Sequence, residues 1–332
     1  MKSVELRLKS ESCLLSKSGI HLTEVIQILG PIFALIFVGY ICVSRGFLQQ
    51  SDVSGLGKFV IRIALPSTIF LGVTSSNLAE LVQPTFFAIY GFSALAIYFF
   101  SLAVFKYGLK DSLTGSSIKS LGSSFSNSGF IGLPLLLQFF DNPPMAAFAM
   151  VVLFENLVMM PLGLAMLEYG NRDRTKTGQQ VLTAICSQLV KSPLITAIAL
   201  GALVVVSGLP LPSIATDSLG IAAKATAGAG LIYIGGTIAS AELIERYRDM
   251  LIVALFKLVL FPLLVSLALL MGLGSTLNPQ LSTSLVLFAA APMITVYPII
   301  GSKFGYATFC SATLVVTTGL SLITLSCVLL LI

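Results

Sequence analysis

The sequence predicts an all-α polytopic membrane protein whose ten transmembrane helices form two inverted five-helix repeats. The 332-residue chain is 56% hydrophobic and only 10% charged, and its mean hydropathy is +0.98. A soluble domain has about 25% charged residues. The apolar stretches are about 20 residues long, which is enough to cross a bilayer. Two of them, at matching places in the two halves, are interrupted by glycine and proline.

The apolar stretches define the expected spans, whose ends are approximate. They cover residues 25–44, 55–74, 85–106, 115–138, 145–167, 185–207, 217–240, 249–272, 281–303 and 307–331. An odd number of spans in each half makes the second half enter the membrane from the opposite side, which predicts inverted repeats. The resulting divisions are an N-terminal extension (1–24), a first repeat (25–167), a cytoplasmic linker (168–184) and a second repeat (185–332).

Basic residues indicate which side of the membrane each loop faces. The loops after odd-numbered spans contain Arg45, Lys106, Arg172 and Lys303, among others, whereas the loops after even-numbered spans contain no Lys or Arg. Because cytoplasmic loops collect Lys and Arg, we expect the odd-numbered loops inside and both termini outside. The basic segment 1–24 departs from this pattern and is either an interfacial stretch or an over-extended start.

The fourth span contains the first interruption. Asn127 and Ser128 are followed by Gly129, Gly132 and Pro134. Glycine relaxes the backbone and proline removes an N–H donor. Backbone groups freed in lipid must be satisfied by protein, water or a solute. The Asn127 amide can both donate and accept, so we expect it to orient a solute, the alternative being a kink that serves only helix packing.

The ninth span contains the second interruption, at Pro292, Thr295 and Pro298. Paired interruptions in two repeats are the best sequence pointer to a transported solute. The ends of half-helices carry partial charges, and their N-termini attract anions such as a carboxylate. We therefore expect broken helices 4 and 9 to cross and to form a substrate site together.

Several charged residues lie deep in the expected spans. Glu155 is the only acid at such depth, which suggests proton coupling. The alternative is a neutral side chain hydrogen-bonded to Asn156 or to a neighbouring helix. Lys224 is either a counter-charge for an anion or a side chain that snorkels to the surface. Arg62 and Lys257 lie similarly deep from the other side, and we interpret both as snorkelling.

Two patterns of small residues accompany the interruptions. Ser116, Ser120 and Ser123 share one helical face with Asn127. They serve either the site or helix packing, because serine is common at helix interfaces in membranes. The glycines of 228–236 in the seventh span predict a close approach of two helices.

The residue inventory excludes several function classes. The chain has one histidine, His21, and none of its five cysteines forms a CxxC pair, so we expect no metal site and no cofactor. There is no P-loop for ATP. The charges lie in short loops instead of one patch, which excludes nucleic acid. An intramembrane protease would need paired aspartates or a serine dyad at depth, so we expect no enzyme.

One run of the chain resembles a known family. Asn127–Leu135 is similar to the Asn-x-x-x-x-Gly-x-Pro-Leu crossover of the auxin efflux carrier family in its short bacterial form. The resemblance covers about 25–332 and is supported, in order along the chain, by Leu65–Pro66, Ser192–Leu194, Pro298 and Lys303–Gly305. It implies a fold like that of bile-acid and sodium/proton transporters. Spans one, two, six and seven would form a scaffold, and the other spans a mobile core.

The resemblance also implies a function. It indicates a secondary active transporter that moves small organic anions, malonate-, malate- or auxin-like, across the bacterial cytoplasmic membrane by alternating access, with export or proton linkage. By analogy, Asn127, Pro134, Pro292 and Pro298 frame the substrate site. Membrane lipid is a further expected partner, and a homodimer through the scaffold helices is a candidate assembly. The alternatives are a sodium-coupled symporter of the bile-acid type and a non-transporting membrane sensor.

Overall fold

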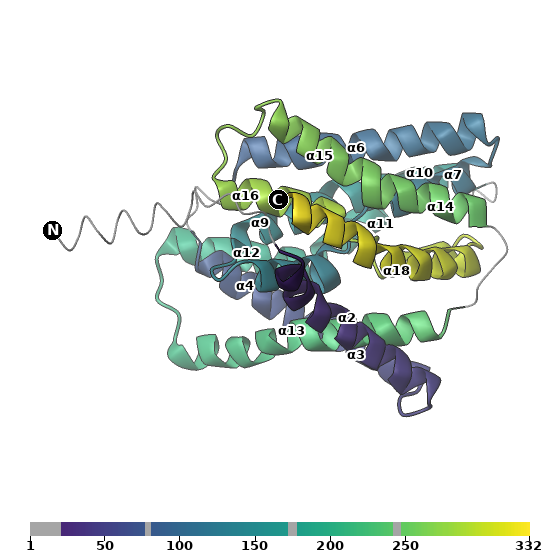
Figure 1. The fold of residues 1–332 in the computed structure, drawn as a ribbon. Coiled ribbons are helices and arrows are strands. Elements are labelled where there is room, and N and C mark those ends of the chain that lie inside the picture. The colour runs from purple at the N-terminus through teal and green to yellow at the C-terminus, as the bar shows by residue number, and fades with distance from the viewer. Residues whose placement is uncertain (1–20, 77–80, 172–177, 242–246) are drawn as a thin grey trace.

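The structure is a computed structural model that describes residues 21–76, 81–171, 178–241 and 247–332. Within these ranges all regular elements are helices, which confirms the predicted all-α class (Figure 1). The basic N-terminal segment before His21 and the linker residue Arg172 lie outside the described residues.

Long apolar helices confirm that the chain is a polytopic membrane protein. Among the described residues, seven helices are long and apolar enough to cross a membrane: Leu22–Ser44, Gln50–Thr74, Pro84–Gly108, Met145–Gly170, Ser213–Ala239, Tyr247–Leu270 and Ala307–Leu331. The first is α2, the fifth is α13 and the last is α18. The other four combine α-helices with π-helical turns: α3 (Gln50–Phe59), η1 (Val60–Ala64) and α4 (Leu65–Thr74); α6 (Pro84–Ala103) and η2 (Val104–Gly108); α9 (Met145–Phe154), η4 (Glu155–Met159) and α10 (Met160–Gly170); α14 (Tyr247–Leu255), η5 (Phe256–Leu260) and α15 (Phe261–Leu270).

Proline explains most of the π-helical turns. Pro66, Pro134, Pro161 and Pro262 each lie at the second position of an α-helix that directly follows such a turn. A proline ring lacks the N–H donor and clashes with the carbonyl four residues earlier. The preceding turn therefore widens, and a single π-helical turn is the usual form of such a bulge.

The fourth, sixth and ninth expected spans are interrupted. The fourth comprises α7 (Leu113–Ser124), η3 (Ser128–Gly132) and α8 (Leu133–Phe139), and the ninth comprises α16 (Pro279–Ala290) and α17 (Tyr297–Ser302). The prediction of a continuous sixth span was wrong, because α11 (Gly178–Val190) ends before α12 (Pro193–Ser207) begins. Ser192 has extended backbone angles, since the residue before a proline avoids the α region.

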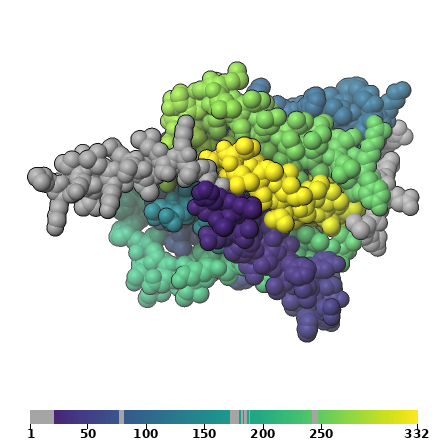
Figure 2. Space-filling model, viewed as in Figure 1, coloured from purple at the N-terminus to yellow at the C-terminus, as the bar shows by residue number. Residues whose placement is uncertain are grey.

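The helices gather into two groups, which contact each other along the molecule. One group contains α2, α3, α4, α12 and α13; the other contains α6, α7, α10 and α14 to α18 (Figure 1). Within the first group, α2 and α13 approach closely, because a Cβ atom added to Gly235 would meet the backbone carbonyl of Ile36. This is the close approach that the glycine cluster predicts. Figure 2 shows α2 against α18, where the groups meet on this face.

The outer surface of the helices is apolar. Phe92 is 72% exposed and Leu331 is 87% exposed. Exposed patches of large apolar side chains suit contact with a membrane, as the composition requires. The interior, in contrast, holds buried polar residues, most of which lie in α7, at the two interruptions and in α18.

Candidate functional site

The two interruptions lie against each other. Residues 125–127 and 291–296 are not helical, and Ser126 pairs with Met293 in an isolated antiparallel bridge. The Asn127 N–H donates to the Pro292 carbonyl at 2.7 Å, and the Ile294 N–H donates to the Phe125 carbonyl at 3.2 Å. Each interruption thus satisfies backbone groups of the other, which is what an apolar surrounding demands of broken helices.

Asn127 joins the two interruptions through its side chain. Its amide nitrogen donates to Thr295 Oγ1 at 2.6 Å, and its Oδ1 accepts from the Phe130 N–H at 3.3 Å. The Asn127 carbonyl accepts from Gly132 N–H at 2.9 Å, at the end of the π-helical turn η3. Both Asn127 and Thr295 are buried. Asn127 therefore has a fixed orientation at the point where the half-helices meet.

Glu155 is hydrogen-bonded to two neighbouring helices. Its Oε1 accepts from the Tyr90 hydroxyl at 2.8 Å, and its Oε2 accepts from Ser128 Oγ at 2.6 Å. Asn156 bonds instead to the Val152 carbonyl of its own helix. The sequence offered Asn156 or a neighbouring helix as the hydrogen-bond partner of Glu155. The structure has the bonds to neighbouring helices and no bond between Glu155 and Asn156. Ser128 links the carboxyl directly to the first interruption.

Lys257 is fully buried, so the interpretation that it snorkels was wrong. Its ammonium donates to the Ala289 carbonyl at 2.7 Å, near the C-terminal end of α16. It also lies 4.5 Å from the ring centroid of Phe261, which in turn packs against Tyr90. The C-terminal end of a helix carries a partial negative charge and unpaired carbonyls. The Lys257 ammonium binds one of these carbonyls and offsets the partial charge at the second interruption. Its side chain is therefore directed to the helix end and not to the membrane surface.

A small cavity opens beside the first interruption. It has a volume of about 190 Å³ and lies where η1, the interruption, η4 and the start of α12 meet. Its polar lining comes from Ser126, Asn127, Ser128, Glu155, Asn156 and Ser192. The Ser126 hydroxyl is buried and has no hydrogen-bond partner among the described residues. A buried polar group normally has a partner, so this hydroxyl is available to a solute.

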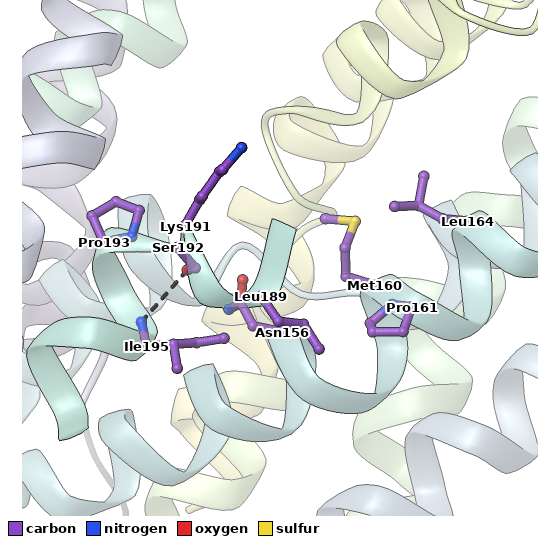
Figure 3. Close-up of a pocket in the computed structure, with 9 residues that line it drawn as sticks. All are labelled: Asn156, Met160, Pro161, Leu164, Leu189, Lys191, Ser192, Pro193 and Ile195. Carbon is purple, nitrogen blue, oxygen red and sulfur yellow. Dashed lines mark hydrogen bonds between the residues drawn. The ribbon is translucent and has the colours of Figure 1, made fainter. Parts of the chain in front are cut away.

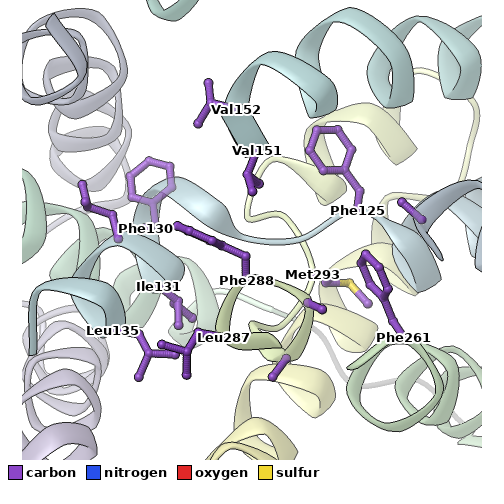
Figure 4. Close-up of a cluster of buried hydrophobic side chains, with 14 of the residues drawn as sticks. Phe125, Phe130, Ile131, Leu135, Val151, Val152, Phe261, Leu287, Phe288 and Met293 are labelled. Carbon is purple, nitrogen blue, oxygen red and sulfur yellow. The ribbon is translucent and has the colours of Figure 1, made fainter. Parts of the chain in front are cut away.

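Apolar side chains form the other walls around the crossing. Phe130 and Ile131 of η3 belong to the same buried cluster as Leu287, Phe288 and Met293 from the ninth span (Figure 4). The rings of Phe288 and Phe148 stack with centroids 6.1 Å apart. This packing holds the polar backbone of both interruptions away from lipid.

A second, larger cavity adjoins the first. Its volume is about 390 Å³, and both cavities are lined by Asn156, Met160, Ser192 and Pro193. Figure 3 shows these residues together with Lys191, which stands between α11 and α12. Sequence reasoning missed Lys191, because the sixth span was expected to be continuous there.

Comparison with known proteins identifies the family. The family described as "Membrane transport protein" matches residues 24–329. The chain belongs to this family. It is the auxin efflux carrier family that the crossover motif resembles. The chain is therefore an integral membrane transporter and not an enzyme.

Individual relatives agree with the family. A Rhizobium meliloti (strain 1021) protein named "Putative malonate transporter" is 24% identical over 306 residues, which are 92% of this chain and 95% of that protein. The Escherichia coli (strain K12) protein named "Uncharacterized transporter YfdV" is 25% identical over 291 residues, 86% of this chain and 90% of its own. A Methanocaldococcus jannaschii protein, "Uncharacterized transporter MJ1031", is 34% identical over 121 residues, 35% and 38% of the two chains.

The remaining predicted site residues of this transporter differ in their relation to the cavity. Gly129 lines it, whereas Pro134, Pro298 and Gly132 do not. A Cβ atom added to Gly132 would lie 2.8 Å from Phe288, so this glycine permits the close packing of η3 against α16. Lys224 is exposed on α13 and lines neither cavity.

The serine face of α7 is directed to its own helix. Ser116, Ser120 and Ser123 each donate to the backbone carbonyl four residues earlier. Such bonds satisfy hydroxyls within a packed helix interface. They support the packing interpretation for these serines.

Lys119, in the same helix, is a buried cation inside the fourth expected span. Its ammonium lies 2.6 Å from a carboxylate oxygen of Asp111 and 2.6 Å from one of Asp249. The pairing ties the start of α7 to the start of α14. The signal available in the sequence was the position of Lys119 inside the fourth span, between Ile118 and Leu121.

Within the described residues no group of three or more His, Cys, Asp or Glu side chains gathers in one place. The polar groups of the cavity are hydroxyls, amides and one carboxyl. These groups can orient a small solute by hydrogen bonds, and they suit a ligand that carries its own charge.

Proposed function

We propose that this chain is a secondary active transporter that moves small organic anions across the bacterial cytoplasmic membrane by alternating access. The observation that carries the proposal is the meeting of the two interruptions at Asn127 beside a cavity with polar walls. Broken helices that meet at a solute site between two helix bundles are a recurring design in secondary transporters.

The proposal includes the architecture. We propose ten spans in two inverted repeats, 25–167 and 185–332, with the interrupted spans four and nine crossing. The group of α2, α3, α4, α12 and α13 is the proposed scaffold and the other group is the mobile core. The cavity lies where α12 and η1 of the first group face η3 and η4 of the second. This position supports the proposal, because motion of one group against the other would open and close it.

The proposed substrate carries a carboxylate. The Asn127 amide, the free Ser126 hydroxyl and the helix starts near the cavity offer hydrogen bonds to an oxyanion. The volume of about 190 Å³ suits a few-carbon acid better than a bulky one. The relative whose name includes malonate supports short acids as the first class to test.

Glu155 is the proposed proton carrier. It lines the cavity and bonds to Ser128 of the first interruption. Like charges repel strongly where water is excluded, so an anionic substrate and an ionised Glu155 disfavour each other. Binding of the anion and binding of a proton would then favour each other, and such linkage couples the two fluxes.

Sodium coupling is less well supported than proton coupling. In a broken-helix transporter, free helix carbonyls coordinate the coupling ion. Here the chain's own ammonium, Lys257, already binds the Ala289 carbonyl at the end of α16. A homodimer through the scaffold helices stays a prediction.

Transport by purified protein tests the proposal. The protein is reconstituted into proteoliposomes, and uptake of labelled mono- and dicarboxylates is followed with and without a pH gradient, against protein-free vesicles. We expect saturable uptake of at least one short carboxylate, and dissipation of the gradient by an uncoupler should reduce it. Absence of saturable uptake for the whole panel would contradict the proposal.

A further inference from the structure

Lys191 occupies an unusual depth. It follows α11 and precedes α12, and α12 has 15 residues. At 1.5 Å per residue α12 is about 22 Å long, which is shorter than the hydrocarbon core of about 30 Å. If α12 ends at the membrane surface near Gly208, Lys191 lies within the bilayer thickness and not in a loop outside it.

Lys191 differs from the two buried lysines. Lys119 is paired with two aspartates, and Lys257 is buried against a carbonyl. Lys191 is exposed, and no carboxylate of the described residues lies within salt-bridge distance of it. A cation held at membrane depth without a counter-ion is costly, and such a residue marks a pathway for an ion of opposite charge.

The exposed side chain of Lys191 lines a cavity next to the one at the crossing. It lines the space of about 390 Å³, which shares Asn156 and Ser192 with the cavity beside Asn127. Figure 3 shows the side chain extended, with its ammonium at the free end. The four-carbon stem of a lysine is flexible, so the ammonium can follow a solute in the adjoining spaces.

We propose that Lys191 binds the second carboxylate of a short dicarboxylate whose first carboxylate is held at the crossing. This inference rests on the proposed function and deepens it, since it assigns the substrate class. Asn127 and Ser126 supply neutral hydrogen-bonding groups in the first cavity, and Lys191 supplies a full positive charge in the neighbouring one. A monocarboxylate would use only the first cavity.

The arrangement fits a dianion for an electrostatic reason. The crossing cavity contains no lysine or arginine in its lining, whereas Glu155 stands in its wall. A second negative charge therefore needs its own cation outside that cavity. Lys191 is the cation that lines the adjoining space, and the start of α12 at Pro193 adds a favourable dipole on the same side.

Uptake of two probes of equal chain length tests the proposal. Labelled malonate has two carboxylates and labelled propionate has one. Both are measured in proteoliposomes containing the unaltered protein, Lys191→Gln, Lys191→Arg or the matched control Lys58→Gln, an exposed lysine of α3 that lines neither cavity. Thermal unfolding of each detergent-purified variant, with and without malonate, gives a binding readout that does not depend on transport.

We expect Lys191→Gln to raise the KM for malonate about tenfold, the usual effect of losing a hydrogen bond to a charged group. The KM for propionate should stay unchanged. Lys191→Arg should keep most malonate uptake, and Lys58→Gln should resemble the unaltered protein. The stabilisation by malonate should be smaller in Lys191→Gln than in the other variants and should return at about tenfold higher malonate.

Other outcomes overturn the inference. Equal effects of Lys191→Gln on both probes, or no effect on either, would show that this lysine does not select dicarboxylates. Uptake of propionate without malonate by the unaltered protein would remove the inference and leave organic-anion transport intact. Asn127→Ala measured in parallel separates the two levels: if that variant transports normally, the crossing site itself is wrong.

Discussion

The two interruptions of this transporter use the same backbone device and offer different chemistry. The first, at 125–127, presents Ser126, Asn127 and nearby Ser128 to a cavity. The second, at 291–296, is lined by apolar side chains and contributes Thr295, whose hydroxyl holds the Asn127 amide. In addition, the buried Lys257 ammonium from another helix binds the Ala289 carbonyl at the end of α16, next to the second interruption.

Two interruptions with similar backbone geometry therefore need not both contact a solute. Both segments satisfy each other's backbone, but only the first combines unpaired polar groups with open space. We infer that the first interruption contacts the solute and that the second interruption positions the first. Variants of the two segments should therefore differ in how strongly they affect transport.

The largest effect is expected for Asn127→Ala. The change removes the amide that joins both interruptions and faces the cavity, and a hydrogen bond to a charged group contributes about 1.5–3 kcal/mol. Uptake in proteoliposomes should fall about 10- to 150-fold. Size-exclusion chromatography should show a folded protein. Normal flux would place the solute elsewhere.

Glu155→Gln should change coupling and not folding. Glutamine keeps the size of the side chain and can still accept from Tyr90, but it cannot carry a proton. In the unaltered protein a gradient of about one pH unit can support about tenfold accumulation if one proton accompanies each anion. We expect this gradient-driven accumulation to vanish while exchange without a gradient persists. Continued dependence on the gradient would exclude Glu155 as the carrier.

Gly132→Ala tests the crossing through stability. The added Cβ would lie 2.8 Å from Phe288, which is itself packed against Phe148. Overpacking of this kind costs about 1–3 kcal/mol, so the unfolding temperature in detergent should decrease. Gly228→Ala is the matched control, because its Cβ would meet nothing within 4 Å. Equal behaviour of both variants would mean that the crossing is looser than described.

The smallest effect is expected for Thr295→Val. Valine keeps the shape but removes the hydroxyl that positions Asn127, and an ordinary hydrogen bond contributes about 1 kcal/mol. Uptake should fall about fivefold, clearly less than in Asn127→Ala. If the threonine variant is as inactive as the asparagine variant, the second interruption takes part in binding and the comparison between the segments fails.

Much of this fold could be predicted because its signals are local. Glycine and proline at 129–134 and 292–298 interrupt apolar spans, and Asn127 stands where an amide is unusual. The partners of Glu155 could not be predicted, since Tyr90 and Ser128 come from other helices. Sequence spacing along one helix does not reveal such tertiary contacts.

The surroundings of the deep lysines could not be predicted from the sequence either. Lys257 and Lys191 both stand in apolar sequence, which indicates depth but not surroundings. Whether such a residue snorkels, caps a helix or lines a cavity depends on helices distant in sequence. Ser192–Pro193 did contain a usable local signal, because a serine before a proline favours the start of a new helix. It predicts the break that the structure places there.

The prolines at the π-helical turns have a mechanical consequence. Each of these helices already lacks one backbone hydrogen bond, because proline has no N–H donor. The prolines are Pro66, Pro134, Pro161 and Pro262. Bending the helix at such a proline breaks no further backbone hydrogen bond, whereas bending an intact helix does. We expect the proposed movement of one helix group against the other to bend the helices at these four prolines. The helical segments between them would then move as rigid bodies.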